Sequence, residues 1–125
     1  MHSAPGAGAA GLFRAALTCD KSGSNAKEVL VIAVTATLKA KAGKEQELAR
    51  AVQALAQKVR ANEPDCKLYQ LARSKSDPGL FVLLERYTDD AALAHHSNTP
   101  YFKAGIGEMM ALVDGRPEIR LFDEL

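Results

Sequence analysis

The stretch "AHHSNTPYF" (94–102) places two adjacent histidines before a Thr-Pro pair and two aromatic residues. A neutral imidazole accepts a proton near neutral pH, so a histidine that faces a pocket can act as a general base. Consecutive side chains on a helix point about 100° apart, so at most one of His95 and His96 can face inward. Ala92 and Leu93 share a helix side with His96, which predicts that His96 faces the interior.

The role of His96 has two interpretations. It could be a general base for a bound substrate. It could instead line the core, hydrogen-bond a backbone carbonyl and shape the connection between two helices. A position on an apolar face does not distinguish chemistry from packing, so the residues leave both interpretations open.

Further side chains could line a pocket around this histidine. Tyr69 shares a strand face with Leu71, either as a polar-tipped pocket wall or as a core aromatic. Glu85 joins an otherwise apolar strand face, where it could position a substrate. An ion pair of Glu85 with Arg73 or Arg86 is the alternative. We therefore treat Tyr69 and Glu85 as candidate substrate-binding residues.

The elements that must position these side chains follow from their hydrophobic periodicity. Strand patterns cover 29–40, 67–73, 80–87 and 117–125, and helix patterns cover 45–62, 89–97 and a segment starting at 100. Thr99 and Pro100 suit the N-cap and first position of that last helix. Its predicted apolar stripe comprises Phe102, Ile106, Met109 and Val113. The order β-α-β-β-α-β predicts an α+β, ferredoxin-like fold.

The predicted sheet has more apolar surface than its helices can cover. Helices cover one face of such a sheet, whereas the strands at 29–40 and 80–87 are apolar on both faces. A Val or Leu left in water forfeits about 1.5–3 kcal/mol. The pattern therefore predicts a homodimer, a dimeric α/β barrel in which two sheets pack face to face.

Composition narrows the class of protein. The chain has 125 residues, 47% of them hydrophobic, and a formal net charge of +1 without a basic stripe, so nucleic acid is not an expected partner. Cys19 and Cys66 stand far apart and outside any C-x-x-C pattern, which argues against a disulfide framework and a zinc site. The cysteine pattern makes a reducing, cytoplasmic setting the expectation. No apolar run reaches the about 18 residues of a membrane span, so no membrane partner is expected.

The chain divides at about residue 27. Residues 1–27 are rich in Ala, Gly and Ser and are expected to be an N-terminal extension on a domain covering 28–125. The extension contains "GAGAAG", which matches the dinucleotide-binding pattern G-x-G-x-x-G. That pattern requires a buried strand before it and a helix after it, and only "MHSAP" precedes it here, so no dinucleotide site is expected.

Three segments, "KAGKEQEL", "EPDCKLYQL" and "SDPGLFVLLERYTDDAALAHHSNTPYF", together with the helix that follows them, resemble the antibiotic biosynthesis monooxygenase family of small dimeric α+β barrels. The resemblance covers nearly all of 30–124. Its A-x-x-x-H-x-x-[ST]-P-x-F motif aligns the family histidine with His96. Many members carry a histidine after the proline, where this chain has Tyr101. A haem-degrading branch carries its haem-ligating histidine where this chain has Ile106, so haem degradation is not the expected function.

The resemblance implies a monooxygenase that acts on a quinol or polyphenol with molecular oxygen and uses no metal, haem or flavin. The bound aromatic is deprotonated and passes an electron to oxygen itself. His96 would be the catalytic base. The substrate-binding residues would be Tyr69, Glu85, Tyr101, Phe102 and Ile106.

Two other functions stay open. Relatives that handle phosphorylated autoinducer-type sugars resemble the same region and isomerise their substrate by proton transfer. The third function is a non-catalytic, dimeric module that binds a small molecule.

Overall fold

A computed structural model describes residues 30–125 of the chain. The expectations that fall on residues 1–29, including the extension and the start of the first strand, lie outside the described residues. The elements are β1 (Ile32–Lys39), α2 (Glu45–Asn62), β2 (Cys66–Arg73), β3 (Leu80–Tyr87), α3 (Asp90–Ser97), α4 (Pro100–Met110) and β4 (Glu118–Asp123).

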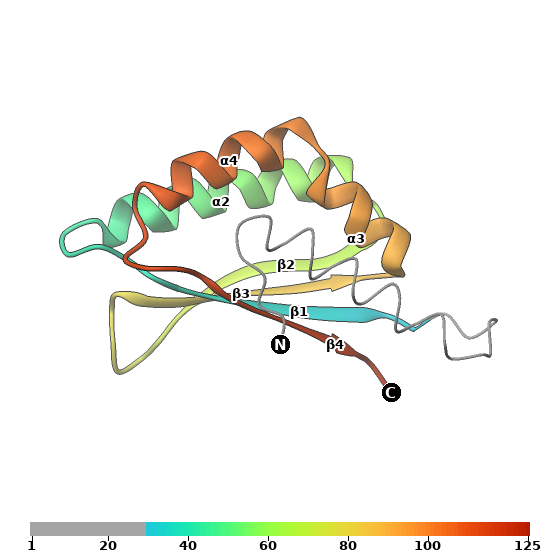
Figure 1. Cartoon of the computed structure of the whole chain (residues 1–125), viewed down its shortest axis with the longest axis horizontal. Helices are drawn as coiled ribbons and strands as arrows, with labels where there is room; N and C mark the ends of the chain where they lie inside the picture. The colour runs from blue at the N-terminus through green and yellow to red at the C-terminus, as the bar shows by residue number, and fades with distance from the viewer. Residues whose placement is uncertain (1–29) are drawn as a thin grey trace.

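The four strands form one antiparallel sheet in the order β2-β3-β1-β4. In Figure 1 the three helices lie on one face of this sheet, and within residues 30–125 the opposite face carries no helix. This is the β-α-β-β-α-β arrangement with α3 as an additional short helix, and it confirms the predicted α+β, ferredoxin-like fold. None of the described helices is long and apolar enough to cross a membrane.

Helix α2 anchors the core. Gly43 has a φ of 82° in the turn before the helix, a conformation that glycine adopts at low cost. The buried residues of α2 are Leu48, Val52, Leu55, Ala56 and Val59. They pack with Leu38 of β1 and with Phe81 and Leu83 of β3 in one cluster. Burying each such side chain contributes about 1.5–3 kcal/mol, so the C-terminal end of α2, at Glu63, is held firmly against the sheet.

The connection between α3 and α4 is a capped corner. Asp89 caps α3 by accepting a hydrogen bond from a backbone N–H of the first turn (2.8 Å). Thr99 caps α4: its Oγ1 accepts from the backbone N–H of Phe102 (3.3 Å) and donates to the carbonyl of His96 (2.9 Å). Pro100 is the first residue of α4, as predicted. The corner therefore fixes the end of α3 relative to the start of α4.

The predicted stripe of α4 is only partly correct. Met109 is buried and Phe102 packs against the core, but Ile106 is half-buried and joins neither core cluster. Gly105 faces α2, where an added Cβ would lie 3.5 Å from the side chain of Leu55. Ile106 is one residue away, and therefore about 100° around the helix. Val113 is buried too, although α4 ends before it.

The sheet face opposite the helices is called here the helix-free face. Its side chains alternate with the buried ones and are Ala33, Thr35, Thr37, Leu68, Gln70, Ala72, Leu80, Val82, Leu84, Arg86, Glu118, Arg120 and Phe122. Strand β3 is apolar on this face as far as Leu84, as predicted, and ends with Arg86, whereas β1 presents one alanine and two threonines. Leu68, Leu84 and Phe122 are exposed here. The prediction that both strands are apolar on both faces is thus correct for β3 and wrong in part for β1.

Charges on the helix-free face are paired. Arg86 donates two hydrogen bonds to the carboxylate of Glu124, at 2.7 and 2.8 Å. Arg120 pairs with Glu118. Both arginines therefore have a carboxylate partner within the same chain.

Candidate active site

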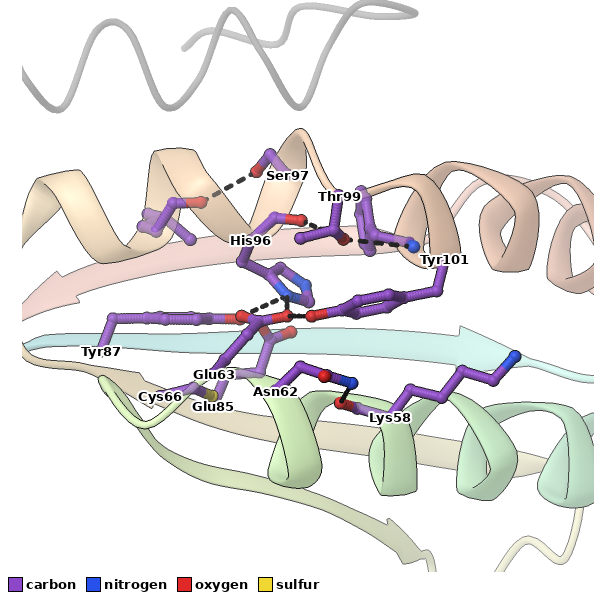
Figure 2. Close-up of polar contacts among 12 residues, drawn as sticks. Lys58, Asn62, Glu63, Cys66, Glu85, Tyr87, His96, Ser97, Thr99 and Tyr101 are labelled. Atoms are coloured by element: carbon purple, nitrogen blue, oxygen red, sulfur yellow. Dashed lines mark hydrogen bonds and ion pairs between the residues drawn. The ribbon is translucent and has the colours of Figure 1, made fainter.

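His96 faces the interior and His95 is exposed, as the helix pattern predicted. The imidazole of His96 is only 2% exposed. Its Nδ1 lies 3.1 Å from each carboxylate oxygen of Glu63 (Figure 2). Its Nε2 is buried and has no hydrogen-bond partner among residues 30–125. Buried polar atoms are rarely left without a partner, so this nitrogen stands out as a possible point of contact with a ligand.

Three aromatic rings surround the imidazole. The ring of Phe102 is nearest, with centroids 4.5 Å apart, and the rings of Tyr69 and Tyr87 follow at 5.2 and 5.4 Å. These side chains come from α4, β2 and β3 respectively. All three rings are tilted relative to the imidazole and contribute aromatic surface from three different elements, and they are called here the aromatic cage.

Glu63 links α2, α3 and α4. It is the C-cap residue of α2 and is only 4% exposed. Besides its contact with His96, its carboxylate accepts a short hydrogen bond from the hydroxyl of Tyr101 (2.5 Å). In Figure 2 the side chains of His96 and Tyr101 converge on this carboxylate.

A second buried carboxyl group lies on β3. Glu85 accepts a hydrogen bond from the hydroxyl of Tyr87 (2.6 Å). The alternative of an ion pair with Arg73 or Arg86 is wrong, because Arg86 pairs with Glu124 and the guanidinium of Arg73 lies over a phenylalanine ring. The physical reason is direction: Glu85 points to the helix side of the sheet and Arg86, its neighbour, to the other.

Burial shifts the acid–base properties of this cluster. Burial raises the pKa of the Glu85 carboxyl group to about 7. The hydrogen bond from Tyr87 opposes this shift, and the negative charge of Glu63 adds to it. Burial lowers the pKa of His96, although Glu63 opposes the shift. The imidazole is therefore neutral near pH 7, the form that can accept a proton.

Burial also keeps the neighbouring hydroxyl and thiol groups protonated. It raises the pKa of Tyr69 and of Tyr87. It raises the pKa of Tyr101 to about 12, with a further contribution from Glu63, and that of Cys66 to about 11. His96 is thus the neutral base of this cluster. Within residues 30–125 no three His, Cys, Asp or Glu side chains gather so that they could hold a metal ion.

A surface hollow of about 330 Å³ adjoins the cluster. Its lining residues are Asn62, Glu63, Pro64, Asp65, Cys66, Asp89, Ala91, Ala92 and His95. Glu63 thus belongs both to the hollow and to the hydrogen-bonded cluster around His96. His96 does not line the hollow, because its imidazole is enclosed by the aromatic cage.

The structure brings most of the predicted site residues together. Tyr69 and Phe102 contact His96 directly, Tyr101 reaches it through Glu63, and Glu85 lies beside the ring of Tyr87. The remaining predicted residue, Ile106, stands one turn after Phe102 on α4, is half-buried and belongs to neither core cluster. The contact of His96 with a carboxylate also differs from the backbone hydrogen bond considered above.

Sequence reasoning missed Glu63 and Tyr87. Glu63 stands 33 residues before His96, in a connection with no periodic pattern. The sequence does carry one signal for Glu63. An acid at the C-terminal end of a helix is electrostatically unfavourable, which indicates that its carboxylate has another partner. Tyr87 continues the buried alternation of β3 and was assigned only to a strand.

The raised pKa of Glu85 gives a testable stability effect. The pKa of Glu85 is about 4.5 in the unfolded chain and about 7 in the folded one. Its contribution to stability is therefore complete below pH 4.5 and is lost as pH rises through 7. Glu85→Gln cannot ionise. We expect the free energy of unfolding of Glu85→Gln, relative to the wild type, to rise by about 2–3 kcal/mol between pH 5 and pH 8. Urea unfolding at the two pH values measures this difference.

Glu108→Gln, at an exposed position of α4, is the control and should show no such trend. Equal changes in stability for the Glu85 variant and the wild type would show that Glu85 is ionised in the folded protein at pH 5.

Comparison with known proteins extends these observations. A family model described as "Antibiotic biosynthesis monooxygenase" matches residues 31–108. The chain is 31% identical over 78 residues to a Bacillus subtilis protein named "Putative monooxygenase YcnE", an alignment that covers 62% of this chain and 81% of that protein.

Solved structures agree with this match. A Caulobacter crescentus protein described as a "putative antibiotic biosynthesis monooxygenase" is 42% identical, with a TM-score of 0.75 and coverage of 78% of this chain and 92% of that one. The protein PA3566 from Pseudomonas aeruginosa is 31% identical, with a TM-score of 0.70 and coverage of 77% and 95%. The family match spans more than half of the chain and includes the elements that carry Glu63, Glu85 and His96. The chain belongs to the antibiotic biosynthesis monooxygenase family.

Proposed function

We propose that the protein is a cofactor-independent monooxygenase that oxidises an electron-rich quinol or polyphenol with molecular oxygen, and that His96 is its general base. The observation that carries this proposal is the imidazole of His96, whose buried Nε2 has no hydrogen-bond partner among the described residues. A neutral base in an aromatic cage suits a flat, apolar substrate that must lose a proton.

The reaction begins when Nε2 accepts a proton from a phenolic hydroxyl or an acidic C–H group. The resulting anion is a stronger reductant than the neutral quinol, and it passes electrons to oxygen. Over the full reaction the substrate loses two hydrogen atoms and gains one oxygen atom. The second oxygen atom leaves as water, so the substrate itself supplies the electrons.

The substrate ring is proposed to bind where Phe102 now packs against His96. Phe102 is half-buried and its ring is the nearest to the imidazole. We propose that displacement of this side chain opens the imidazole to the substrate, while the rings of Tyr69 and Tyr87 stay against it. The hydroxyl of Tyr101 already binds Glu63, so it lies at the polar edge of the same site.

A phosphorylated sugar is a poorer match. The adjoining hollow is lined by the carboxyl groups of Glu63, Asp65 and Asp89, and its lining within the described residues includes no lysine or arginine. A phosphate group there would face three acidic residues, with the imidazole of His95 as the lining side chain that can carry a positive charge. The structure therefore gives this isomerase function no specific support.

Oxygen consumption tests the proposal. Purified protein is mixed with a panel of quinols and polyphenols, and oxygen uptake is recorded together with the oxidised product. Use of ¹⁸O₂ should place one labelled oxygen atom in the product and one in water. Binding of a quinol without oxygen uptake would support the non-catalytic module, and turnover of a phosphosugar without oxygen would support the isomerase.

We also propose that the protein is a homodimer in which two helix-free faces pack together. The support is the set of exposed apolar side chains on this face, Leu68, Leu84 and Phe122, which lie among intramolecularly paired charges. Contiguous apolar sheet surface is seldom left exposed on a monomer. The dimer would place the two candidate sites on its outer sides, because the helices cover the opposite faces of the sheets (Figure 1).

A further inference from the structure

We propose that Glu63 is a positioning residue that holds His96 in the tautomer protonated at Nδ1, so that the lone pair of Nε2 faces the aromatic cage. This inference rests on the proposed function, since it assigns a residue that prepares the base for proton abstraction. The geometry that carries it is the Tyr101–Glu63–His96 cluster, in which one buried carboxylate accepts from the hydroxyl of Tyr101 and lies 3.1 Å from Nδ1 of His96.

The tautomer follows from the donors and acceptors present. A carboxylate can only accept hydrogen bonds, and both oxygens of Glu63 lie 3.1 Å from Nδ1 of His96. The hydroxyl of Tyr101 donates to one of these oxygens. Nδ1 must therefore carry the hydrogen. In a neutral imidazole the other nitrogen, Nε2, is then the unprotonated one, and it can accept a proton from substrate.

The location of Glu63 supports a role other than stabilising its helix. It lies at the C-terminal end of α2, where the helix dipole makes a negative charge unfavourable. It is also buried, which costs free energy unless the carboxylate is well paired. Its side-chain partners in the structure, His96 and Tyr101, lie on the two helices of the capped corner. Glu63 therefore fixes the orientation of the imidazole from outside the reacting site.

Nuclear magnetic resonance tests the tautomer without any assay of activity. Long-range ¹H–¹⁵N correlation spectra distinguish a protonated ring nitrogen from an unprotonated one. The chain has three histidines, and the spectrum of His95→Gln helps to assign His96. In the wild type at neutral pH we expect His96 to be protonated at Nδ1. A wild-type spectrum with the proton on Nε2 would overturn the proposal, whatever the behaviour of any variant.

The variant Glu63→Gln keeps the shape of the side chain but removes its charge, and its amide can also donate to Nδ1. We expect the tautomer protonated at Nε2 to gain population and the pKa of His96 to fall. The titratable groups around His96 that stay in place are Cys66, Tyr69, Glu85, Tyr87, His95 and Tyr101. Glu85→Gln removes the other buried acid, which does not bind His96, and should leave the tautomer of His96 unchanged.

Kinetics give a second readout. With an active quinol, Glu63→Gln should lower kcat by about 10-fold to 100-fold, the usual effect of removing the partner that orients a functional histidine, while KM stays unchanged. The acidic limb of the pH profile should shift to lower pH with the pKa of His96. An unchanged tautomer and an unchanged pH limb would show that Glu63 is only structural. If no quinol is oxidised, the proposed function fails, and the spectra still decide the role of Glu63.

Discussion

Replacing His96 with alanine should lower the rate of quinol oxidation by about 10²–10⁴-fold, the usual contribution of a positioned general base. The reason is that His96 is a neutral base inside the aromatic cage, and its Nε2 has no hydrogen-bond partner among residues 30–125. His95→Ala should change the rate little, because His95 is exposed and points away from the cage. Initial rates of oxygen uptake on one verified substrate measure both variants.

Loss of folding would mimic loss of catalysis, so thermal midpoints must accompany the rates. His96→Gln is the second variant, since its amide can still donate to Glu63 but cannot act as a base near neutral pH. A folded His96→Gln protein should be as slow as His96→Ala. If the folded His96 variants keep the full rate and His95→Ala loses it, His96 is not the base.

The pH profile should agree with the same assignment. Burial lowers the pKa of His96, so the imidazole stays neutral, and the enzyme active, somewhat below the ordinary histidine pKa of about 6.5. Activity should fall as pH drops through this lowered value, because a protonated imidazole cannot accept a proton. A rate that rises toward acidic pH would contradict a basic role for His96.

The elements were predictable because their patterns are long and periodic. Helix α2 covers 45–62 and β3 covers 80–87, the ranges expected from the repeats of apolar residues. The inward direction of His96 followed from its neighbours on a single short helix. In each case the information lies within a few residues of the feature, and helix or strand geometry converts it into a direction.

The contacts between elements were harder to predict from the sequence. Glu63 and His96 meet only because the end of α2 packs beside α3, a juxtaposition that no local pattern encodes. The half-buried position of Ile106 depends on which side of α4 faces α2, and the neighbouring Gly105 lies on that side. The ion pair proposed for Glu85 failed for a different reason, because the alternation of strand side chains already places Arg86 on the opposite face of the sheet.

The second large expected effect is dissociation of the proposed dimer when a charge is placed on the helix-free face. Leu84 lies in the middle of β3, is 36% exposed and points away from the helices. In a two-fold dimer, Leu84→Asp would introduce one carboxylate from each protomer into the interface. At a desolvation cost of about 3 kcal/mol for each carboxylate, the dissociation constant of the dimer should rise by about 10⁴-fold. Sedimentation velocity over a range of protein concentrations measures this change.

The matched control is Met110→Asp, because Met110 is 39% exposed and lies on α4, on the opposite side of the sheet. Both variants add the same charge at an equally exposed apolar position, so only their location differs. If the helix-free faces pack together, Leu84→Asp should be monomeric at micromolar concentration while Met110→Asp and the wild type remain dimeric. Dissociation by Met110→Asp alone would place the interface on the helices, and a monomeric wild type would show that these apolar side chains are left in water.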